Sequence, residues 1–363
     1  MILPGEETAK TTRGNVPSEK QAIVETTKGH RSILKFHCWE DHLLEPELYM
    51  TGNLLLPVSL QCLSPDRVTP CDLFHRTGEN TYVYFARKNY LFSADNQDRL
   101  RANGVEHLYV TEEDAALYLA YLKDLLVSTF RDPCCSVEKK AATLYATSQD
   151  IMRRVFDDPR TFFIDHAHDI IVQFVDLIVS DVNVTRCLIR LASHEPSTYI
   201  HSTNVGIFST ALAGAMLGHT PGKGFRNCGA SFFLHDIGKC CIPLEILNKT
   251  GPLTDEEFSI IKTHPNHGYQ LLKDAGGFSE EDMTITLQHH ERDNGSGYPY
   301  GLKGDDIHPY AKICRLADVY EALTADRPYR KSYSTFEALN IMKKEVGDMD
   351  RVMFEQFVKL FGF

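Results

Sequence analysis

The chain has 363 residues, of which 43% are hydrophobic, and its formal net charge is −11 at pH 7. This length allows two substantial cores, and the composition is that of a soluble globular protein. The negative charge argues against broad binding to nucleic acid polymers or to anionic membrane surfaces. It leaves room for a small anionic ligand in a locally basic pocket.

The N-terminus and the cysteines bear on location. The first 20 residues are polar and lack the apolar core of a signal peptide. No stretch reaches the apolar length of a membrane span. The ten cysteines show neither zinc-type CxxC spacing nor a disulfide framework. We therefore expect a cytoplasmic protein with reduced thiols.

The N-terminal third predicts a tail and a small domain. Residues 1–36 are rich in polar residues and are expected to form a disordered tail. Within residues 37–130, TYVYFA and HLYV predict short strands, SADNQDRLRANG predicts a helix closed by Gly104, and EEDAALYLAYLKDLLVSTF predicts a second helix. This pattern indicates an α/β module. It carries no phosphate loop or metal cluster, so we expect a regulatory or structural role.

Helical patterns dominate the rest of the chain. SVEKKAATLYATSQDIMRRVF predicts a long helix inside a helical linker, residues 131–164, and helix follows helix from residue 165 onward. In TDEEFSIIKTHPNHGYQLLKDAG, Thr254 and Glu257 form a capping box, and Pro265 predicts a kink just after His264. The expected fold is mainly α: an all-α C-terminal helical bundle joined by the linker to the smaller N-terminal α/β domain.

Histidines and aspartates recur through the C-terminal half. They are His201 in YIHSTNV, His235 and Asp236 in FFLHDIGK, His264 in KTHPNHG, His289 and His290 in LQHHER, and Asp318 in RLADVYEALTADRPYR. Imidazole together with carboxylate suits divalent ions such as iron, manganese or zinc. Five histidines and two aspartates exceed the needs of one tetrahedral ion. They fit two ions that share a bridging carboxylate.

Each motif also has an ordinary structural explanation. A single histidine on a helix is more often a core or surface residue than a ligand, because motif matches carry a high false-positive rate. DIGK could simply cap a helix, and the glycines of NGSGYP form a loop under any hypothesis. The combination of all these motifs in one segment favours a metal site.

HDIGK, KTHPNHG, HHERDNGSGYPYGLKGDDI and ADVYEALTADRPYR, in this order, resemble the HD-GYP family of cyclic dinucleotide phosphodiesterases, a branch of the HD metal-hydrolase superfamily. The resemblance covers residues 165–363. It implies metal-dependent hydrolysis of c-di-GMP to linear pGpG, with further cutting to GMP left open, through hydroxide held between two metals. A phosphodiesterase for 3′,3′-cyclic GMP-AMP and a non-catalytic signalling adaptor are the alternatives. The intact motifs disfavour the adaptor.

The resemblance also implies roles for single residues. The implied metal ligands are His201, His235, Asp236, His264, His289, His290 and Asp318, with Asp236 as the bridge. Lys239 would act with Asp236 in catalysis and point its ammonium group at the scissile phosphate. Tyr298 would contact the dinucleotide. Arg327 and Arg330 would hold phosphate, for which a guanidinium fork is suited.

Two positions depart from the family pattern. Ser197 stands where members with three metals have a glutamate, and Glu195 would project from another side of a helix. We therefore expect two divalent ions, iron or manganese, and no third. Asp293 stands where many relatives have an aromatic residue, which leaves the base preference open. Expected partners are the cyclic dinucleotide, a second copy bound through the helical linker and a regulatory protein.

Overall fold

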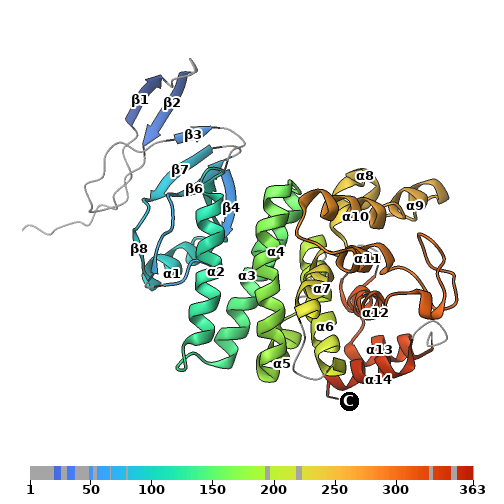
Figure 1. Cartoon of the computed structure of the whole chain (residues 1–363). Helices are drawn as coiled ribbons and strands as arrows, with labels where there is room; N and C mark the ends of the chain where they lie inside the picture. The colour runs from blue at the N-terminus through green and yellow to red at the C-terminus, as the bar shows by residue number, and fades with distance from the viewer. Residues whose placement is uncertain are drawn as a thin grey trace, which may run out of the picture. The chain divides into compact units, whose positions relative to one another are not determined.

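The computed structural model describes residues 20–25, 31–36, 49–51 and 55–362, with gaps at residues 66, 79–80, 193–196, 218–222, 327–329 and 345–349. The chain divides into two compact units, residues 1–118 and 119–363. Figure 1 colours the chain from the N-terminal strands in blue to the C-terminal helices in red.

Unit 1 is built around an antiparallel sheet. Its described elements are β1 (Lys20–Glu25), β2 (Arg31–Phe36), β3 (Tyr49–Thr51), β4 (Leu55–Ser59), β5 (Arg67–Val68), β6 (Leu73–Gly78), β7 (Thr81–Ala86), β8 (Leu91–Phe92), α1 (Ala94–Ala102), β9 (His107–Thr111) and the start of α2 (Ala115–Arg131). Five strands form one sheet in the order β3-β7-β6-β9-β4. Leu55, Phe74 and Tyr82 pack together in its core.

The predicted strands and helices of unit 1 are confirmed. TYVYFA is β7, HLYV lies in β9, and α1 starts at Ser93 with a capping box and ends before Gly104, whose φ is +73°. The segment expected to be a disordered tail contains β1 and β2, which pair as antiparallel strands. The rest of that segment, residues 1–19 and 26–30, lies outside the described residues.

Unit 2 is a helical bundle, so the expected mainly α fold is confirmed. Its elements after α2 are α3 (Val137–Asp157), α4 (Thr161–Ser180), α5 (Val182–Leu191), α6 (Thr198–Leu217), α7 (Lys223–Leu234), η1 (Ile237–Cys241), α8 (Leu244–Leu247), α9 (Asp255–Ile261), α10 (His264–Ala275), α11 (Glu280–Gln288), η2 (Gly304–Asp306), α12 (Pro309–Thr324), α13 (Thr335–Lys344) and α14 (Arg351–Leu360). No helix among the described residues combines the length and apolarity needed to cross a bilayer.

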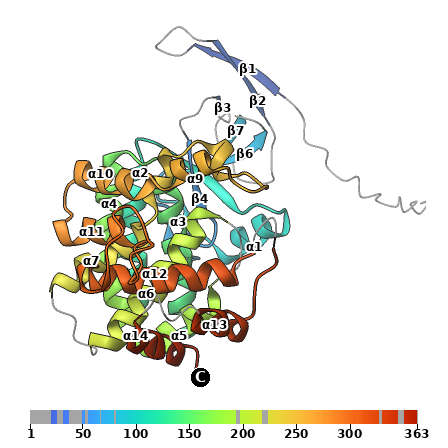
Figure 2. The same cartoon turned by 90° about the vertical axis from the view of Figure 1, so that its right-hand side faces the viewer.

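Helix α6 lies at the centre of the bundle. It packs against α3, α4, α5, α7, α12 and α14, and its residues from Ile200 to Gly214 are buried. A helix that is covered on all sides needs apolar or small residues all round, as in the sequence GIFSTALAGA. Figure 2 shows α6 and α12 side by side, and both helices carry predicted metal ligands.

The segment predicted as a linker contributes to the bundle. Its helix α3 packs against α4, α5 and α6. Leu144, Ile151 and Val155 are among the residues that α3 buries. This amphipathic helix therefore uses its apolar face inside unit 2.

The chain around Pro265 differs from the predicted kink. Helix α9 ends at Ile261, and a separate helix, α10, begins at His264 with Pro265 in its first turn. The prediction of one kinked helix was wrong because proline lacks an N–H and its ring would clash with the carbonyl four residues earlier. The break leaves the Ile261 carbonyl open, and it accepts a hydrogen bond from His264 Nδ1 at 2.8 Å.

Candidate metal centre

The predicted metal ligands meet inside unit 2, from α6, α10, α12 and the chain just after α7 and α11. Their ligand atoms form two groups, and within each group all atoms lie within 4.8 Å of one another. The first group is His201, His235 and Asp318, and the second group is Asp236, His264, His289 and His290. Residues more than a hundred positions apart in sequence are thus brought together.

Asp236 lies between the two groups. Its Oδ2 is 3.2 Å from His201 Nε2 and 3.5 Å from His235 Nε2. Its Oδ1 is 3.2 Å from His264 Nε2 and 3.7 Å from His289 Nε2. The two oxygens of one carboxylate therefore face different sets of histidines, which is the geometry of a bridging ligand.

Asp318 makes a second connection between the groups. Its Oδ1 is 3.2 Å from His201 Nε2, and its Oδ2 is 3.8 Å from His290 Nδ1. His290 thus turns Nδ1 toward the centre, whereas the other four histidines turn Nε2. These contacts join Asp236, His201, Asp318 and His290 in one continuous chain of polar side chains.

Helix ends hold three of the histidines in place. The outer nitrogens are bonded to backbone carbonyls: Nδ1 of His235, His264 and His289 lie 2.9, 2.8 and 2.7 Å from the carbonyl oxygens of Phe232, Ile261 and Thr286. Each carbonyl is in the last turn of a helix, where it lacks a helical donor. Donation from Nδ1 leaves Nε2 unprotonated and free to bind a metal.

His201 is held differently, by a side chain that the sequence reasoning missed. Its Nδ1 makes a close contact with the buried carboxylate of Glu321. Burial alone would lower the pKa of His201, but Glu321, Asp236 and Asp318 together raise this pKa well above its usual value. The available signal was spacing, because Glu321 follows Asp318 by three residues and so shares its helix face.

The pKa values match the needs of metal ligands. Burial lowers the pKa values of His264, His289 and His290, so these imidazoles are neutral at pH 7. Burial would raise the pKa of Asp236, but Lys239 and the nearby histidines lower it well below its usual value. Asp236 is therefore an anion. Three neutral imidazoles therefore lie beside this negative carboxylate.

Orphaned polar atoms show that the donors fit a cation. Among the described residues, the buried atoms His201 Nε2, His235 Nε2 and Asp236 Oδ1 have no hydrogen-bond partner. Leaving such atoms buried without a partner costs free energy. A divalent ion would accept these lone pairs, and imidazole with carboxylate suits iron, manganese or zinc. The cluster could therefore hold metal ions.

Ser197 occupies the position at which a glutamate would bind a third metal. It has a structural role instead. Its hydroxyl accepts a hydrogen bond from the backbone N–H of Ile200 at 3.3 Å, so it caps the start of α6. Glu195 lies outside the described residues. In the part of unit 2 that the structure describes, no third group of metal-binding side chains appears.

Lys239 stands at the edge of the centre. It lies in the 3-10 turn η1, its side chain is 22% exposed, and its ammonium group closely contacts Asp236 Oδ2. The predicted basic residue is therefore next to the bridging carboxylate and still reachable from solvent.

Of the two arginines predicted to bind phosphate, the structure describes only Arg330. Arg330 donates to the carbonyls of Ala322 and Leu323, at 2.8 and 3.0 Å, and so caps the end of α12. These hydrogen bonds direct its guanidinium to backbone carbonyls and not to the two metal-binding groups. Arg327 lies outside the described residues.

Tyr298 forms one wall of the site. Its ring stacks on His290, with centroids 4.6 Å apart and planes at 27°. The Phe258 ring centroid is 6.4 Å away, and Lys262 Nζ lies 4.4 Å from the Phe258 centroid and 5.8 Å from that of Tyr298. Burial, followed by Asp318 and Asp236, raises the pKa of Tyr298, so its phenol stays protonated. The sequence reasoning found Tyr298 but not Phe258 or Lys262.

The loop that carries Tyr298 is tied to the metal ligands by Glu291. This carboxylate is 1% exposed and follows His290 directly. It accepts hydrogen bonds from the backbone N–H groups of Tyr300 at 2.7 Å and Leu302 at 2.9 Å. The two bonds hold the far side of the loop close to the histidine pair.

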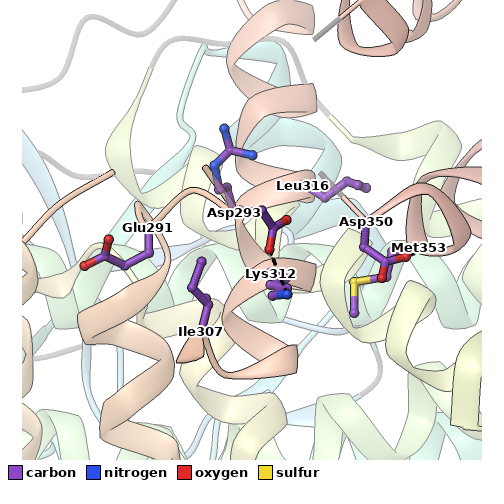
Figure 3. Close-up of a pocket in the computed structure, with 8 residues that line it drawn as sticks. Glu291, Asp293, Ile307, Lys312, Leu316, Asp350 and Met353 are labelled. Carbon is purple, nitrogen blue, oxygen red and sulfur yellow. Dashed lines mark hydrogen bonds and ion pairs between the residues drawn. The ribbon is translucent and has the colours of Figure 1, made fainter. Parts of the chain in front are cut away.

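A second tie involves Asp293. Asp293 Oδ1 is 2.7 Å from Lys312 Nζ on α12, and Figure 3 shows this ion pair as a dashed line. The adjoining cavity measures about 10 Å³ and is lined by Glu291 and Met353 among others. It has room for one water molecule at most. The pair therefore anchors the loop and does not open a ligand pocket.

The chain is similar to several known proteins. A family model described as an HD domain matches residues 187–352. The cyclic di-GMP phosphodiesterase PA4108 of Pseudomonas aeruginosa is 32% identical over 296 residues, which cover 77% of this chain and 71% of that protein. The 3′3′-cGAMP-specific phosphodiesterase 1 of Vibrio cholerae is 42% identical over 128 residues, 35% of this chain and 30% of that protein.

Two further similarities extend the comparison. The cyclic di-GMP phosphodiesterase response regulator RpfG of Xanthomonas campestris is 43% identical over 115 residues, 31% of this chain and 30% of that protein. The solved structure of Bd1817, an HDG"Y"P protein from Bdellovibrio bacteriovorus, has a TM-score of 0.65 at 20% identity, covering 85% of this chain and all of that one. That likeness concerns the fold. The chain belongs to the HD-GYP family.

Proposed function

We propose that this protein is a metal-dependent phosphodiesterase that hydrolyses the cyclic dinucleotide c-di-GMP to linear pGpG. One observation carries the proposal: the two oxygens of Asp236 face separate sets of histidines at 3.2–3.7 Å. The relative that matches along most of the chain is named as a c-di-GMP phosphodiesterase. The cGAMP-specific relative makes 3′,3′-cyclic GMP-AMP the second candidate substrate.

The proposed centre holds two divalent ions, iron or manganese. His201, His235 and Asp318 would bind one ion, His264, His289 and His290 would bind the other, and Asp236 would bind both. When bound, such a pair supplies an activated water and neutralises charge on the phosphate. The protein's part is to hold seven donors in place through helix-end carbonyls and buried carboxylates.

Lys239 acts on the substrate in this proposal. Its ammonium group now contacts Asp236 and is partly exposed, so a phosphate placed before the centre would come within its reach. There it would donate a hydrogen bond to a non-bridging oxygen and stabilise charge that develops during hydrolysis. Tyr298, as a protonated phenol, can donate to the same dinucleotide.

The wall beside the centre supports binding of a base. Tyr298 and Phe258 offer aromatic faces, and Lys262 adds a positive charge over both. Bases stack on such faces without needing a sequence-specific hydrogen bond. Arg330 uses three hydrogen bonds on carbonyls, and a guanidinium has five N–H donors. We therefore keep Arg330, with Arg327, as a phosphate-binding candidate.

For the rest of the chain we propose a regulatory role. The α/β module of residues 37–130 would act on the metal domain, residues 165–363, through the helical segment 131–164 between them. A cytoplasmic location and a regulatory protein partner fit this arrangement. A second copy bound through the same segment would have to use surfaces other than the face that α3 buries in unit 2.

The test is a product assay under anaerobic conditions. Protein reconstituted with Fe(II) or Mn(II) is incubated with c-di-GMP and, separately, with 3′,3′-cyclic GMP-AMP, and products are separated by chromatography. We expect linear product, formed faster from c-di-GMP, and none from Asp236→Ala. Faster cutting of cyclic GMP-AMP would assign the second candidate. No product from either substrate, in protein that holds metal, would contradict the proposed activity.

A further inference from the structure

One of the five histidines is oriented by a charged side chain, and the others that donate from Nδ1 use neutral carbonyls. We propose that Glu321 is a positioning residue: its carboxylate orients His201 and strengthens the hold of the first group on its ion. This inference rests on the proposed metal-dependent function. It concerns a residue that binds neither metal nor substrate itself.

The contact fixes which nitrogen of His201 can bind a metal. Glu321 is 2% exposed, and its Oε2 contacts His201 Nδ1. A carboxylate can only accept, so Nδ1 carries a proton and Nε2 is the nitrogen left to bind a metal. That Nε2 lies 3.2 Å from both Asp236 and Asp318. The ring therefore points Nε2 between two carboxylates, where a cation would take the place of its proton.

The charge of Glu321 distinguishes the first group from the second. A carboxylate behind an imidazole makes the ring a more basic ligand than a carbonyl does. In the second group, His264 and His289 donate to carbonyls. Each group contains one aspartate, so Glu321 is the carboxylate that makes the surroundings of the first group the more negative. Loss of Glu321 should therefore weaken one ion position and leave the other.

Glu321 is itself held in one orientation. Asn204 Nδ2 donates to Glu321 Oε1 at 3.4 Å, and Tyr145 Oη donates to Asn204 Oδ1 at 3.1 Å. His201 and Asn204 lie one turn apart on α6, and Asp318 and Glu321 lie one turn apart on α12. The longer glutamate side chain reaches the outer nitrogen of His201 while Asp318 faces the inner one. The hydrogen bonds continue to Tyr145 on α3.

The experiment measures Mn(II) binding by the full-length chain. Wild type, Glu321→Gln and Glu321→Ala are freed of metal and equilibrated anaerobically with Mn(II), and bound metal and the electron paramagnetic resonance spectrum are recorded. We expect wild type to bind two ions and to show the spectrum of a coupled pair. In Glu321→Ala one ion should bind roughly 10–100-fold more weakly, so that isolated Mn(II) replaces the pair.

Glu321→Gln separates charge from shape. The amide keeps the size and one acceptor for His201, so it should retain the fold and show a smaller loss than Glu321→Ala. Glu355→Gln, which removes an exposed carboxylate on α14, is the matched control and should bind as wild type does. Circular dichroism and thermal unfolding of the metal-free proteins check that each variant folds.

The outcomes separate this inference from the proposed function. Two ions bound with wild-type affinity and a wild-type spectrum in Glu321→Ala would overturn the role of Glu321. The same result in Glu321→Gln would overturn it if Glu321→Ala does not fold. A wild-type chain that binds no Mn(II) pair would instead overturn the proposed metal centre.

Discussion

The adjacent residues His289 and His290 illustrate how the site depends on where a helix ends. Neighbouring side chains on a continuing helix point about 100° apart. Helix α11 stops at Gln288, and the turn that follows brings the two rings to a centroid distance of 4.1 Å. Both imidazoles can therefore join the second group.

The buried histidines should make the metal-free protein acid-sensitive. His264, His289 and His290 have folded pKa values below 6.5 because burial disfavours their charged forms. The unfolded chain therefore binds more protons as the pH falls below 6.5, and the free energy of unfolding decreases. His201 has the opposite shift, so its contribution is complete below 6.5 and is lost only as the pH rises through its folded pKa.

We predict a lower unfolding temperature of the metal-free protein at about pH 5.5 than at about pH 6.5. Each of the three histidines can contribute up to about 1.4 kcal/mol per pH unit. Asp236 stays ionised throughout this range because its pKa lies far below it. Calorimetry after chelation gives the measurement. An unfolding temperature that stays constant or rises over this interval would rule out neutral buried histidines.

Phe258 tests the proposed base-stacking wall. Removing its ring with Phe258→Ala should raise KM for the dinucleotide roughly tenfold, because a stacking contact contributes about 1–3 kcal/mol per base. The metal content should not change. Phe336→Ala removes another exposed phenylalanine, on α13, and serves as the control. Steady-state kinetics give the measurement. An unchanged KM in Phe258→Ala would show that Phe258 does not contact the substrate.

At the scale of elements, two backbones come into close contact beside the centre. The turn η1, which follows Asp236, packs on α10, which begins at His264. A Cβ atom on Gly238 would lie 2.0 Å from the His264 carbonyl oxygen and 2.5 Å from the Gly268 nitrogen. Both backbone atoms belong to α10, whose first residue is the predicted ligand His264. Glycine is therefore required in HDIGK for packing.

Gly238→Ala should lower the free energy of unfolding by about 1–3 kcal/mol, which is the usual cost of overpacking. The variant should also retain less metal. Gly251→Ala is the matched control, because a Cβ there meets nothing within 4 Å. Denaturant unfolding of the two variants gives the comparison. Equal stabilities for both would show that the approach of η1 to α10 is not tight.

Sequence spacing predicted some elements well and others poorly. The capping box at Thr254 and Glu257 is present because it depends only on neighbouring residues. The effect of Pro265 was predicted as a kink, and the chain breaks into α9 and α10 instead. A local pattern shows that a helix is interrupted. It does not show whether the segments before and after the proline form one kinked helix or two separate helices, as α9 and α10 do here.

At the scale of the molecule, the predicted metal-binding side chains could be found from the sequence. The residues that surround them could not. The metal-binding side chains stand in short motifs whose residue types are chemically unusual. The residues around them are of ordinary types: Glu321 contacts His201 across 120 positions, and Phe258 approaches Tyr298 from another element. Such contacts depend on how helices cross. The three-residue spacing places Glu321 on the same helix face as Asp318, but spacing does not show which residues of other helices these side chains meet.

The division of the chain leads to a prediction about autonomy. Both metal-binding groups and the helices from α3 to α14 that surround them lie in residues 119–363. Deleting residues 1–130 should leave a fragment that folds, binds metal and hydrolyses the dinucleotide. Circular dichroism, metal analysis and the product assay would be applied to the same sample. A folded fragment without metal would show that the centre needs the N-terminal part of the chain.

The central claim is that a pair of ions joined by Asp236 carries out the hydrolysis, and a metal titration of activity tests it most directly. Metal-free protein receives increasing Mn(II) under anaerobic conditions, and bound metal and the rate of linear dinucleotide formation are measured together. We predict little activity with one ion per chain and full activity as the second binds. Full activity at one ion, or no product at two, would contradict the account.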